Sequence, residues 1–94
     1  MALDFYAIQV TPTRNSDWFW VGFSSRREKY YASKHFSSEL IFPNIDLAQQ
    51  HAFSFLKPVR EMEYDDGMQE VWALRVVGVS LEVHSDGFII QYDR

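Results

Sequence analysis

Cysteine is absent from the 94-residue sequence. Its absence excludes disulfide frameworks, thiolate nucleophiles, cysteine-based zinc fingers and iron–sulfur clusters, and it is typical of a reducing compartment. Only four glycines are present. The sequence contains no phosphate-binding glycine loop, dinucleotide-binding motif or Gly-x-Ser-x-Gly nucleophile elbow. We therefore predict no catalytic residues and no cofactor, and expect that the protein is not an enzyme.

Long hydrophobic runs are missing as well. The longest, such as residues 18–21, are far shorter than the about 20 residues that a membrane span needs. Residues 1–10 lack the positive segment and the apolar stretch of an export signal. We expect a cytoplasmic protein with no membrane attachment.

What the sequence does contain is apolar and aromatic. Hydrophobic residues make up 47% of the chain and aromatic residues 17%, a composition far from that of disordered proteins. A length of 94 residues suits one hydrophobic core. We predict a single globular domain over residues 1–94.

Alternating apolar residues predict strands in the first half of the chain. The expected strands are residues 5–11, 18–24 and 30–33, with a short fourth at 39–42. One helix is expected over residues 46–57, capped by Asp46 and stopped by Pro58. Its predicted buried stripe consists of Ile45, Ala48, Ala52, Phe55 and Leu56.

The last third of the chain predicts two hairpins. The first pairs residues 59–64 with 70–77 around Asp65, Asp66 and Gly67, and the second pairs 79–83 with 88–92. Gly78 between them suggests a bulge or a bend. An alternative makes residues 68–77 a second helix, but the β-branched valines favour strand. The predicted fold class is α+β: a mostly antiparallel sheet of about four to six strands with one main helix on one face.

Charge is distributed unevenly along the chain, whose formal net charge is −4. Residues 26–60 hold six basic and three acidic residues, whereas residues 61–94 hold two basic and eight acidic ones. Such asymmetry either produces one basic face and one acidic face, or folds so that the two parts neutralise each other. The sequence leaves both arrangements open.

Two clusters are candidate binding surfaces. The first is acidic and consists of Glu61, Glu63, Asp65, Asp66 and Glu70. Glu61 and Glu63 would share the solvent side of a strand, and the cluster would either protect a sheet edge or engage a basic partner. The second combines aromatic and basic residues, as nucleic-acid binders do: Trp18, Trp20, Arg26, Arg27, Lys29 and Tyr31.

Metal binding is not expected. His35, His51 and His84 are 16 and 33 residues apart, and no cysteine completes a ligand set. His51 lies at the edge of the predicted helical stripe and is interpreted as a boundary residue. His84, Ser85 and Asp86 are consecutive, so they cannot form a hydrolytic relay.

These features favour a non-catalytic protein-binding domain of the regulator, inhibitor or adaptor type, which engages a basic partner protein through the acidic segment. Small acidic inhibitors of nucleic-acid enzymes from mobile elements have this composition, although that is analogy without a motif. The alternatives are nucleic-acid binding through residues 18–34 and small-ligand binding between helix and sheet. A homodimer formed through a sheet edge is compatible with each of them.

Overall fold

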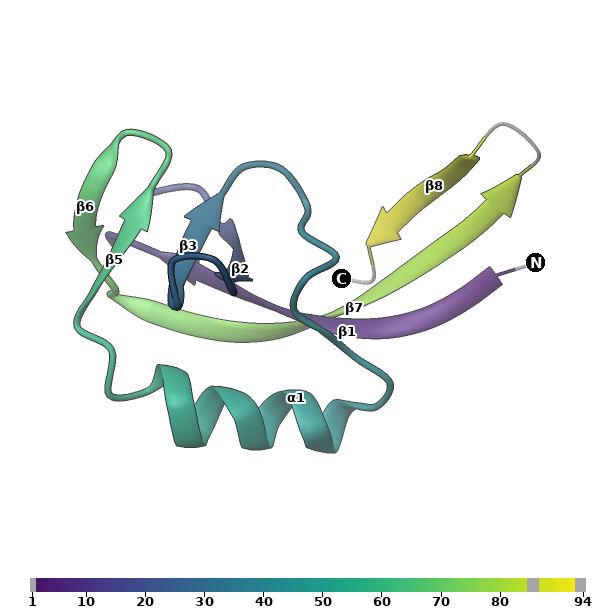
Figure 1. Ribbon diagram of the computed structural model, residues 1–94, viewed down its shortest axis with the longest axis horizontal. Helices are drawn as coiled ribbons and strands as arrows, with labels where there is room; N and C mark the ends of the chain where they lie inside the picture. The colour runs from purple at the N-terminus through teal and green to yellow at the C-terminus, as the bar shows by residue number, and fades with distance from the viewer. Residues whose placement is uncertain (1, 85–86, 93–94) are drawn as a thin grey trace.

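The computed structural model describes the backbone of residues 2–84 and 87–92 and the side chains of residues 4–80. The elements, in chain order, are β1 (Ala2–Thr11), β2 (Phe19–Ser24), β3 (Lys29–Ser33), β4 (Ile41–Phe42), α1 (Ile45–His51), η1 (Ala52–Leu56), β5 (Glu61–Tyr64), β6 (Gly67–Glu70), β7 (Ala73–His84) and β8 (Gly87–Tyr92). Figure 1 shows the long β1 and β7 crossing the molecule, with the helical segment along one side.

The strands form one sheet in the order β6-β5-β3-β2-β1-β7-β8, with the two-residue β4 paired to β1. Every pair is antiparallel except β3 with β5, which are parallel. β1 pairs with β7 over its whole length, from Ala2 opposite Glu82 to Thr11 opposite Ala73. The predicted α+β class with a mostly antiparallel sheet is confirmed, but the eight strands of the described residues exceed the expected four to six.

The two faces of β1 belong to different clusters because alternate residues of a strand point to opposite sides. Ile8 and Val10 contribute to the main core, together with Phe19, Val21, Ala32, Leu40, Leu56, Met62 and Tyr64. Ala7 packs on the opposite face with Trp20 and Val79. Phe36, from the loop after β3, covers this second cluster, and its ring meets that of Trp20 edge to face at 5.1 Å.

The helix begins one residue after Asn44, not at Asp46 as the sequence suggests. The Asn44 side chain accepts a hydrogen bond from the backbone N–H of Leu47 at 2.9 Å, and Asp46 lies in the first turn. Asn44 therefore caps the helix, since its extended backbone and short polar side chain meet both requirements of an N-cap.

The end of the helical segment is a π-helix, η1, in which the backbone N–H of Lys57 bonds to the carbonyl of Ala52 at 2.8 Å. A π turn holds more residues than an α turn, so it brings Leu56 onto the sheet and rotates Phe55 away from it. Phe55 is 59% exposed and Ile45 43% exposed, contrary to the predicted stripe. Ala48 and Leu56 are buried as expected.

The hairpin after the helix is shorter than predicted. β5 and β6 pair from Glu61 opposite Glu70 to Tyr64 opposite Gly67, whose positive φ of 119° only glycine adopts readily. Residues 73–77 belong to β7 and pair with β1, so the predicted pairing of 70–77 with 59–64 is wrong beyond Glu70. The alternative helix over 68–77 is also wrong.

The second predicted hairpin is confirmed, with β7 and β8 paired from Val79 opposite Tyr92 to His84 opposite Gly87. The rest of its turn, Ser85 and Asp86, lies outside the described residues. Gly78 stands in regular register opposite Tyr6, not at a bulge. Among the described residues, no helix is long and apolar enough to cross a bilayer.

Candidate functional site

The acidic residues of β5 and β6 lie on the side of the hairpin away from the core. Met62 and Tyr64 are buried, so the alternate residues Glu61 and Glu63 face outward. Cross-strand register adds two residues of β6 to the same side, with Met68 opposite Glu63 and Glu70 opposite Glu61. We call this surface the acidic face: Glu61, Glu63, Met68 and Glu70.

Glu61 and Glu70 form a like-charged pair. They are direct partners across the hairpin and both are exposed. Within the part of the chain whose side chains are described, neither carboxylate has a Lys or Arg within ion-pair distance. Like charges directly opposite each other destabilise a strand pair. This part of the acidic face thus presents uncompensated negative charge.

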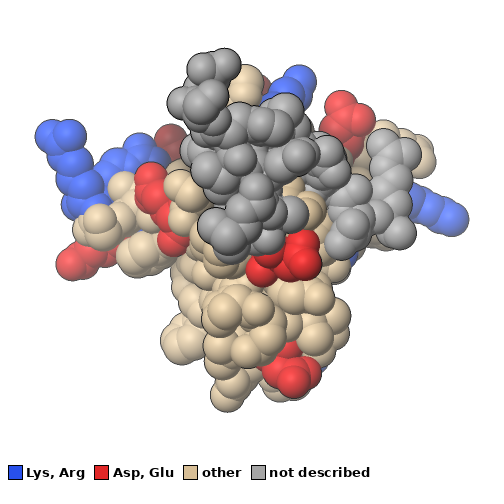
Figure 2. Space-filling model, turned by 90° about the vertical axis from the view of Figure 1, so that its right-hand side faces the viewer, with Lys and Arg blue, Asp and Glu red and all other residues tan. Residues whose placement is uncertain are grey.

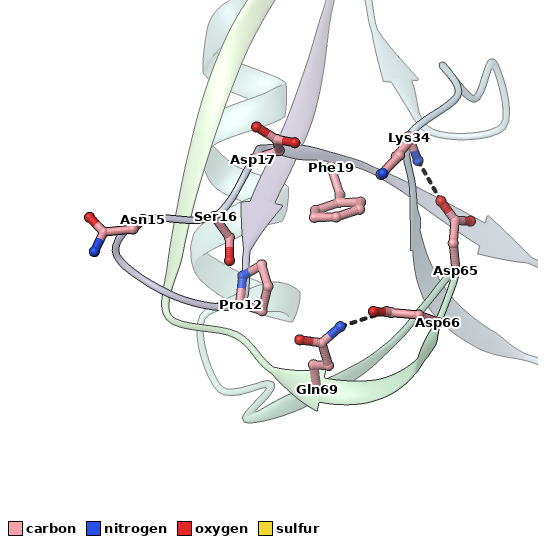
Figure 3. A pocket seen from close by; sticks show the side chains of 9 residues that line it. All are labelled: Pro12, Asn15, Ser16, Asp17, Phe19, Lys34, Asp65, Asp66 and Gln69. Carbon is pink, nitrogen blue, oxygen red and sulfur yellow. Dashed lines mark hydrogen bonds between the residues drawn. The ribbon is translucent and has the colours of Figure 1, made fainter.

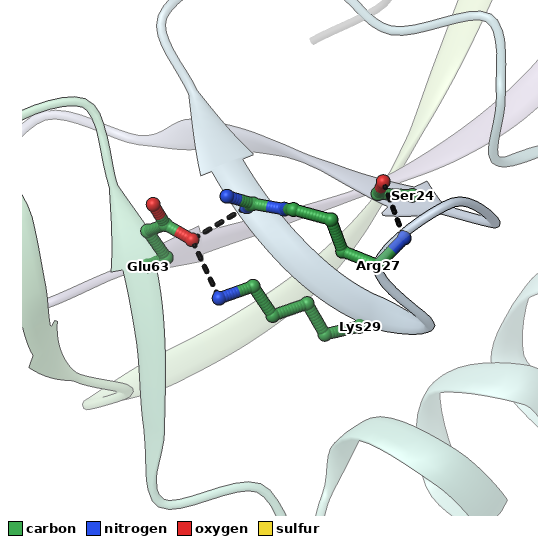
Figure 4. A network of polar contacts seen from close by, with 4 residues as sticks. All are labelled: Ser24, Arg27, Lys29 and Glu63. Carbon is green, nitrogen blue, oxygen red and sulfur yellow. Dashed lines mark hydrogen bonds and ion pairs between the residues drawn. The ribbon is translucent and has the colours of Figure 1, made fainter.

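Glu63, in contrast, is neutralised by Arg27 in the loop between β2 and β3 and by Lys29 at the start of β3. Its Oε2 atom lies 2.5 Å from the Arg27 guanidinium and 3.0 Å from Lys29 Nζ (Figure 4). The parallel pairing of β3 with β5, in register at Tyr31 and Glu63, brings these groups together. Hydrogen bonds from Lys29 and then Arg27 lower the pKa of Glu63 below its ordinary value.

A groove of about 350 Å³ runs beside the acidic face. Apolar and charged side chains both line it: Glu28, Lys29, Tyr30, Val59, Glu61, Met62, Glu63 and Met68. Met68 is 61% exposed, so an incoming side chain would meet an apolar thioether next to carboxylates. The groove suits a long side chain with an apolar stem and a positive end.

Asp65 and Asp66 occupy the turn of the hairpin, at a different place from the acidic face. Asp65 accepts a hydrogen bond from the backbone N–H of Lys34 at 2.9 Å, and Asp66 accepts one from Gln69 at 2.6 Å. Both line a polar hollow of about 370 Å³, with Pro12, Asn15, Ser16, Asp17, Phe19, Lys34 and Gln69 (Figure 3). Asp17 lies across the hollow, and its carboxylate does not point toward the other two. Over the described chain, no three His, Asp or Glu residues gather in a way that could hold a metal ion.

The predicted aromatic and basic residues are not gathered on one open surface. Trp20 is only 5% exposed and belongs to the second core cluster. Trp18 is half-buried, with the Arg75 guanidinium 4.1 Å from its ring centroid. The Tyr31 hydroxyl contacts Ser37 Oγ at 3.0 Å. Arg27 and Lys29 contact Glu63, and Arg26 is exposed in the loop.

His51 lies at the boundary of the buried stripe of the helix. Its Nε2 atom is 3.0 Å from the Tyr30 hydroxyl, and the rings of Phe42 and Phe55 lie within 5.1 Å of its own. Burial lowers the pKa of His51 below 6.5. Burial also raises the pKa of Tyr64 to about 12, and the Tyr64 hydroxyl donates to the Glu70 carbonyl at 3.0 Å.

Sequence reasoning missed two exposed aromatic residues, Phe53 in η1 and Trp72 in the connection between β6 and β7. Phe53 is 68% exposed and Trp72 56% exposed. The position of Phe53 outside the predicted stripe was the available signal, whereas nothing in the sequence distinguishes Trp72 from a core tryptophan. Comparisons of this chain with family models, with curated proteins and with solved structures yield no match.

Proposed function

We propose that this protein is a protein-binding domain whose acidic face docks onto a basic segment of a partner protein. The uncompensated pair of Glu61 and Glu70 is the observation that supports it most directly. A cation placed between these carboxylates would relieve their repulsion and gain two charge-assisted contacts. The bound state would thus remove an unfavourable interaction that is present in the free protein.

The groove beside the acidic face supports a lysine or arginine as the docking group. The aliphatic stem would lie against Val59 and Met68 while the charged end reaches Glu61. Met68 adds exposed apolar area beside Glu63 on the acidic face, which a partner side chain could bury. This combination favours a protein partner over a nucleic acid, because phosphates would be repelled by the same carboxylates.

The proposal describes a cytoplasmic regulator, inhibitor or adaptor that acts by occupying its partner and carries out no reaction of its own. The chain lacks cysteine, which fits a reducing compartment. Concentrated charge of one sign also accelerates encounter with a basic partner, so binding should weaken as salt rises.

A comparative pull-down from lysate tests this proposal. Glu61→Lys/Glu70→Lys should release proteins that the wild type retains, since it reverses the charge of the acidic face. Retention by the wild type should fall by ten-fold or more between low and high salt. The retained proteins are identified by mass spectrometry, and the absorbance ratio at 260 and 280 nm reports any nucleic acid.

The matched control is Asp17→Lys/Glu39→Lys, which makes the same change in net charge at exposed positions away from the acidic face. It should retain the same proteins as the wild type. Equal retention by the acidic-face variant and the wild type would refute the proposal. Loss in both variants would show that net charge, not the acidic face, governs binding.

A further inference from the structure

The groove beside the acidic face already contains a cation of the chain itself. Carboxylates of Glu28, Glu61 and Glu63 line this groove, and Lys29 alone among its described lining residues is basic. Lys29 Nζ lies 3.0 Å from Glu63 Oε2. Figure 2 shows basic side chains at the margins of the molecule that extend outward, whereas the Lys29 side chain reaches across to β5 (Figure 4). In the free protein Lys29 therefore occupies the position of a bound cation.

The parallel pairing of β3 with β5 places Lys29 in the groove. The two strands are in register at Tyr31 and Glu63. Two residues earlier on both strands, Lys29 comes level with Glu61. Alternate residues of a strand share a side, so Lys29 lies on the same side of the sheet as Glu61 and Glu63. Glu61 thus has Lys29 on the neighbouring strand to one side and Glu70 on the strand to the other.

Lys29 is held loosely. Its side chain is 49% exposed and that of Glu63 34% exposed. An ion pair this open to water contributes little to stability. Lys29 and Arg27 contact the same oxygen, Oε2, so Glu63 keeps the Arg27 contact when Lys29 leaves (Figure 4). Among the described side chains, no ion pair involves the second oxygen, Oε1. Exchange of Lys29 for another cation therefore leaves no buried charge unpaired.

A guanidinium can make contacts in this groove that the Lys29 ammonium does not make. Its planar fork donates to two acceptors at once, whereas an ammonium acts as a single point of charge. Glu61 and Glu63 lie two residues apart on the same side of β5, and both line the groove. A guanidinium can therefore reach Glu63 Oε1 and the Glu61 carboxylate together. A lysine from a partner would only replace one ammonium with another, so the groove favours arginine.

On the basis of the proposed function, we infer that Lys29 is an internal occupant of the groove and that an arginine of the partner protein displaces it. The incoming guanidinium binds Glu61 and Glu63 Oε1, and the Lys29 side chain turns out toward solvent. Lys29 thus sets a threshold that the cation of a partner must exceed. An arginine gains contacts in the exchange and a lysine does not, so the partner segment is one that presents arginine.

The experiment measures fluorescence anisotropy of two labelled octapeptides, one alternating Arg and Ala and one alternating Lys and Ala. The wild type should bind the Arg–Ala peptide roughly five-fold more tightly than the Lys–Ala peptide. Lys29→Gln should bind both peptides about ten-fold more tightly than the wild type does, because it empties the groove of its own cation. Lys29→Arg keeps the charge but places a guanidinium in the groove, so it should bind both peptides more weakly than the wild type.

The matched control is Arg26→Gln. It removes the same charge from the connection between β2 and β3, at an exposed residue that has no ion pair among the described side chains. Its affinity for either peptide should differ from that of the wild type by no more than about two-fold. Lys29 is exposed as well, so the fold should tolerate each of these substitutions.

Carbon NMR of the side-chain carboxyl groups gives a second readout. The Arg–Ala peptide should shift the signals of Glu61 and Glu63 and leave those of Asp65 and Asp66 in the hairpin turn unchanged. Shifts confined to Asp65 and Asp66 would overturn the inference.

The affinities separate this inference from the proposed function. Equal affinities of the wild type and Lys29→Gln, an equal gain for Arg26→Gln, or equal binding of the two peptides by the wild type would each overturn the inference. The proposed function would still hold in these cases if Glu61→Lys/Glu70→Lys loses binding. Absence of saturable binding of either peptide to the wild type and to Lys29→Gln would refute both.

Discussion

The imidazole of His51 is partly buried among aromatic rings, whereas His35 is exposed. Three rings, those of Tyr30, Phe42 and Phe55, surround the imidazole, and the Tyr30 hydroxyl is its hydrogen-bond partner. The pKa of Tyr30 is itself raised by burial, so this hydroxyl stays neutral and offers no negative charge to an imidazolium. Protonation of His51 is therefore resisted in the folded state.

Acidification should consequently destabilise the fold through His51. The pKa of His51 is lowered in the folded protein, so the unfolded chain takes up the proton first. The contribution of the neutral His51 side chain to the free energy of unfolding is fully present above pH 6.5. It is lost as pH falls through the lowered pKa. Urea unfolding measures the free energy of unfolding at pH 7.5 and at pH 5.5. Between these pH values the free energy of unfolding should fall more for the wild type than for His51→Gln. Parallel losses in the two proteins would contradict this assignment.

Residue identity alone predicts the role of some side chains and not of others. Met62 and Tyr64 alternate with Glu61 and Glu63, so the buried and exposed sides of β5 follow from the sequence. Trp20 shows the limit, because one of the residues that pack on it is Phe36, which comes from the loop after β3. The sequence contains no sign of that long-range contact.

At the scale of elements, the helix start illustrates competition between two capping residues. Asn44 and Asp46 both have suitable side chains, and Gln49 favours Asp46 as the first member of a capping box. The structure places Asn44 at the cap and begins the helix at Ile45. Ala48 and Leu56 are buried, and this burial is a constraint on the helix that the local capping signals do not contain.

Removal of the cap should therefore be more harmful at Asn44 than at Asp46. Asn44→Ala loses the hydrogen bond to the Leu47 N–H and should cost about 1 kcal/mol of unfolding free energy. Asp46→Ala loses only a favourable charge in the first turn, about 0.5 kcal/mol. Chemical denaturation of the two variants measures the difference. A greater loss for Asp46→Ala would show that the cap lies there in solution.

Strand pairing is less predictable from sequence than strand existence. The alternation of residues 73–77 indicates a strand, but not whether its partner is β5 or β1. The hairpin ends at Glu70. Val71 and Trp72 then connect β6 to β7, and β7 pairs with β1. The candidate acidic cluster was predictable as a set of residues, whereas its division into the acidic face and the turn of Asp65 and Asp66 depends on the β5–β6 register.

For the whole molecule, the uneven charge of the sequence is partly neutralised by folding. Arg27 and Lys29 come from the basic middle of the chain and Glu63 from the acidic last third, and the three meet on neighbouring strands. The sequence leaves open whether the basic and acidic parts of the chain form separate faces or neutralise each other. At Glu63 they neutralise each other. Glu61 and Glu70 remain without a basic partner among the described side chains.

Glu63→Gln should therefore lower the stability of the fold at neutral pH. The pKa of Glu63 is lowered in the folded protein, so its contribution is present above pH 4.5 and is lost as pH falls through the lowered value. Urea titrations should show that the difference in free energy of unfolding between wild type and Glu63→Gln becomes smaller as pH falls from 7 to 3. Glu61→Gln is the control, and it should be neutral or stabilising because it removes a like-charge contact. A pH-independent difference for Glu63→Gln would contradict the ion-pair explanation.

The central position of β1 has a consequence for the order of events during synthesis. β1 emerges from the ribosome before the other strands of this sheet, yet Ala2 pairs with Glu82, near the end of β7. At translation rates of about 5–20 residues per second, β1 waits roughly 4 to 16 seconds for this partner. Until then its apolar residues lack the strand that covers one of its edges. A growing chain of this topology therefore depends on early β1–β2 pairing, or on a chaperone, to keep its first strand from pairing with other chains.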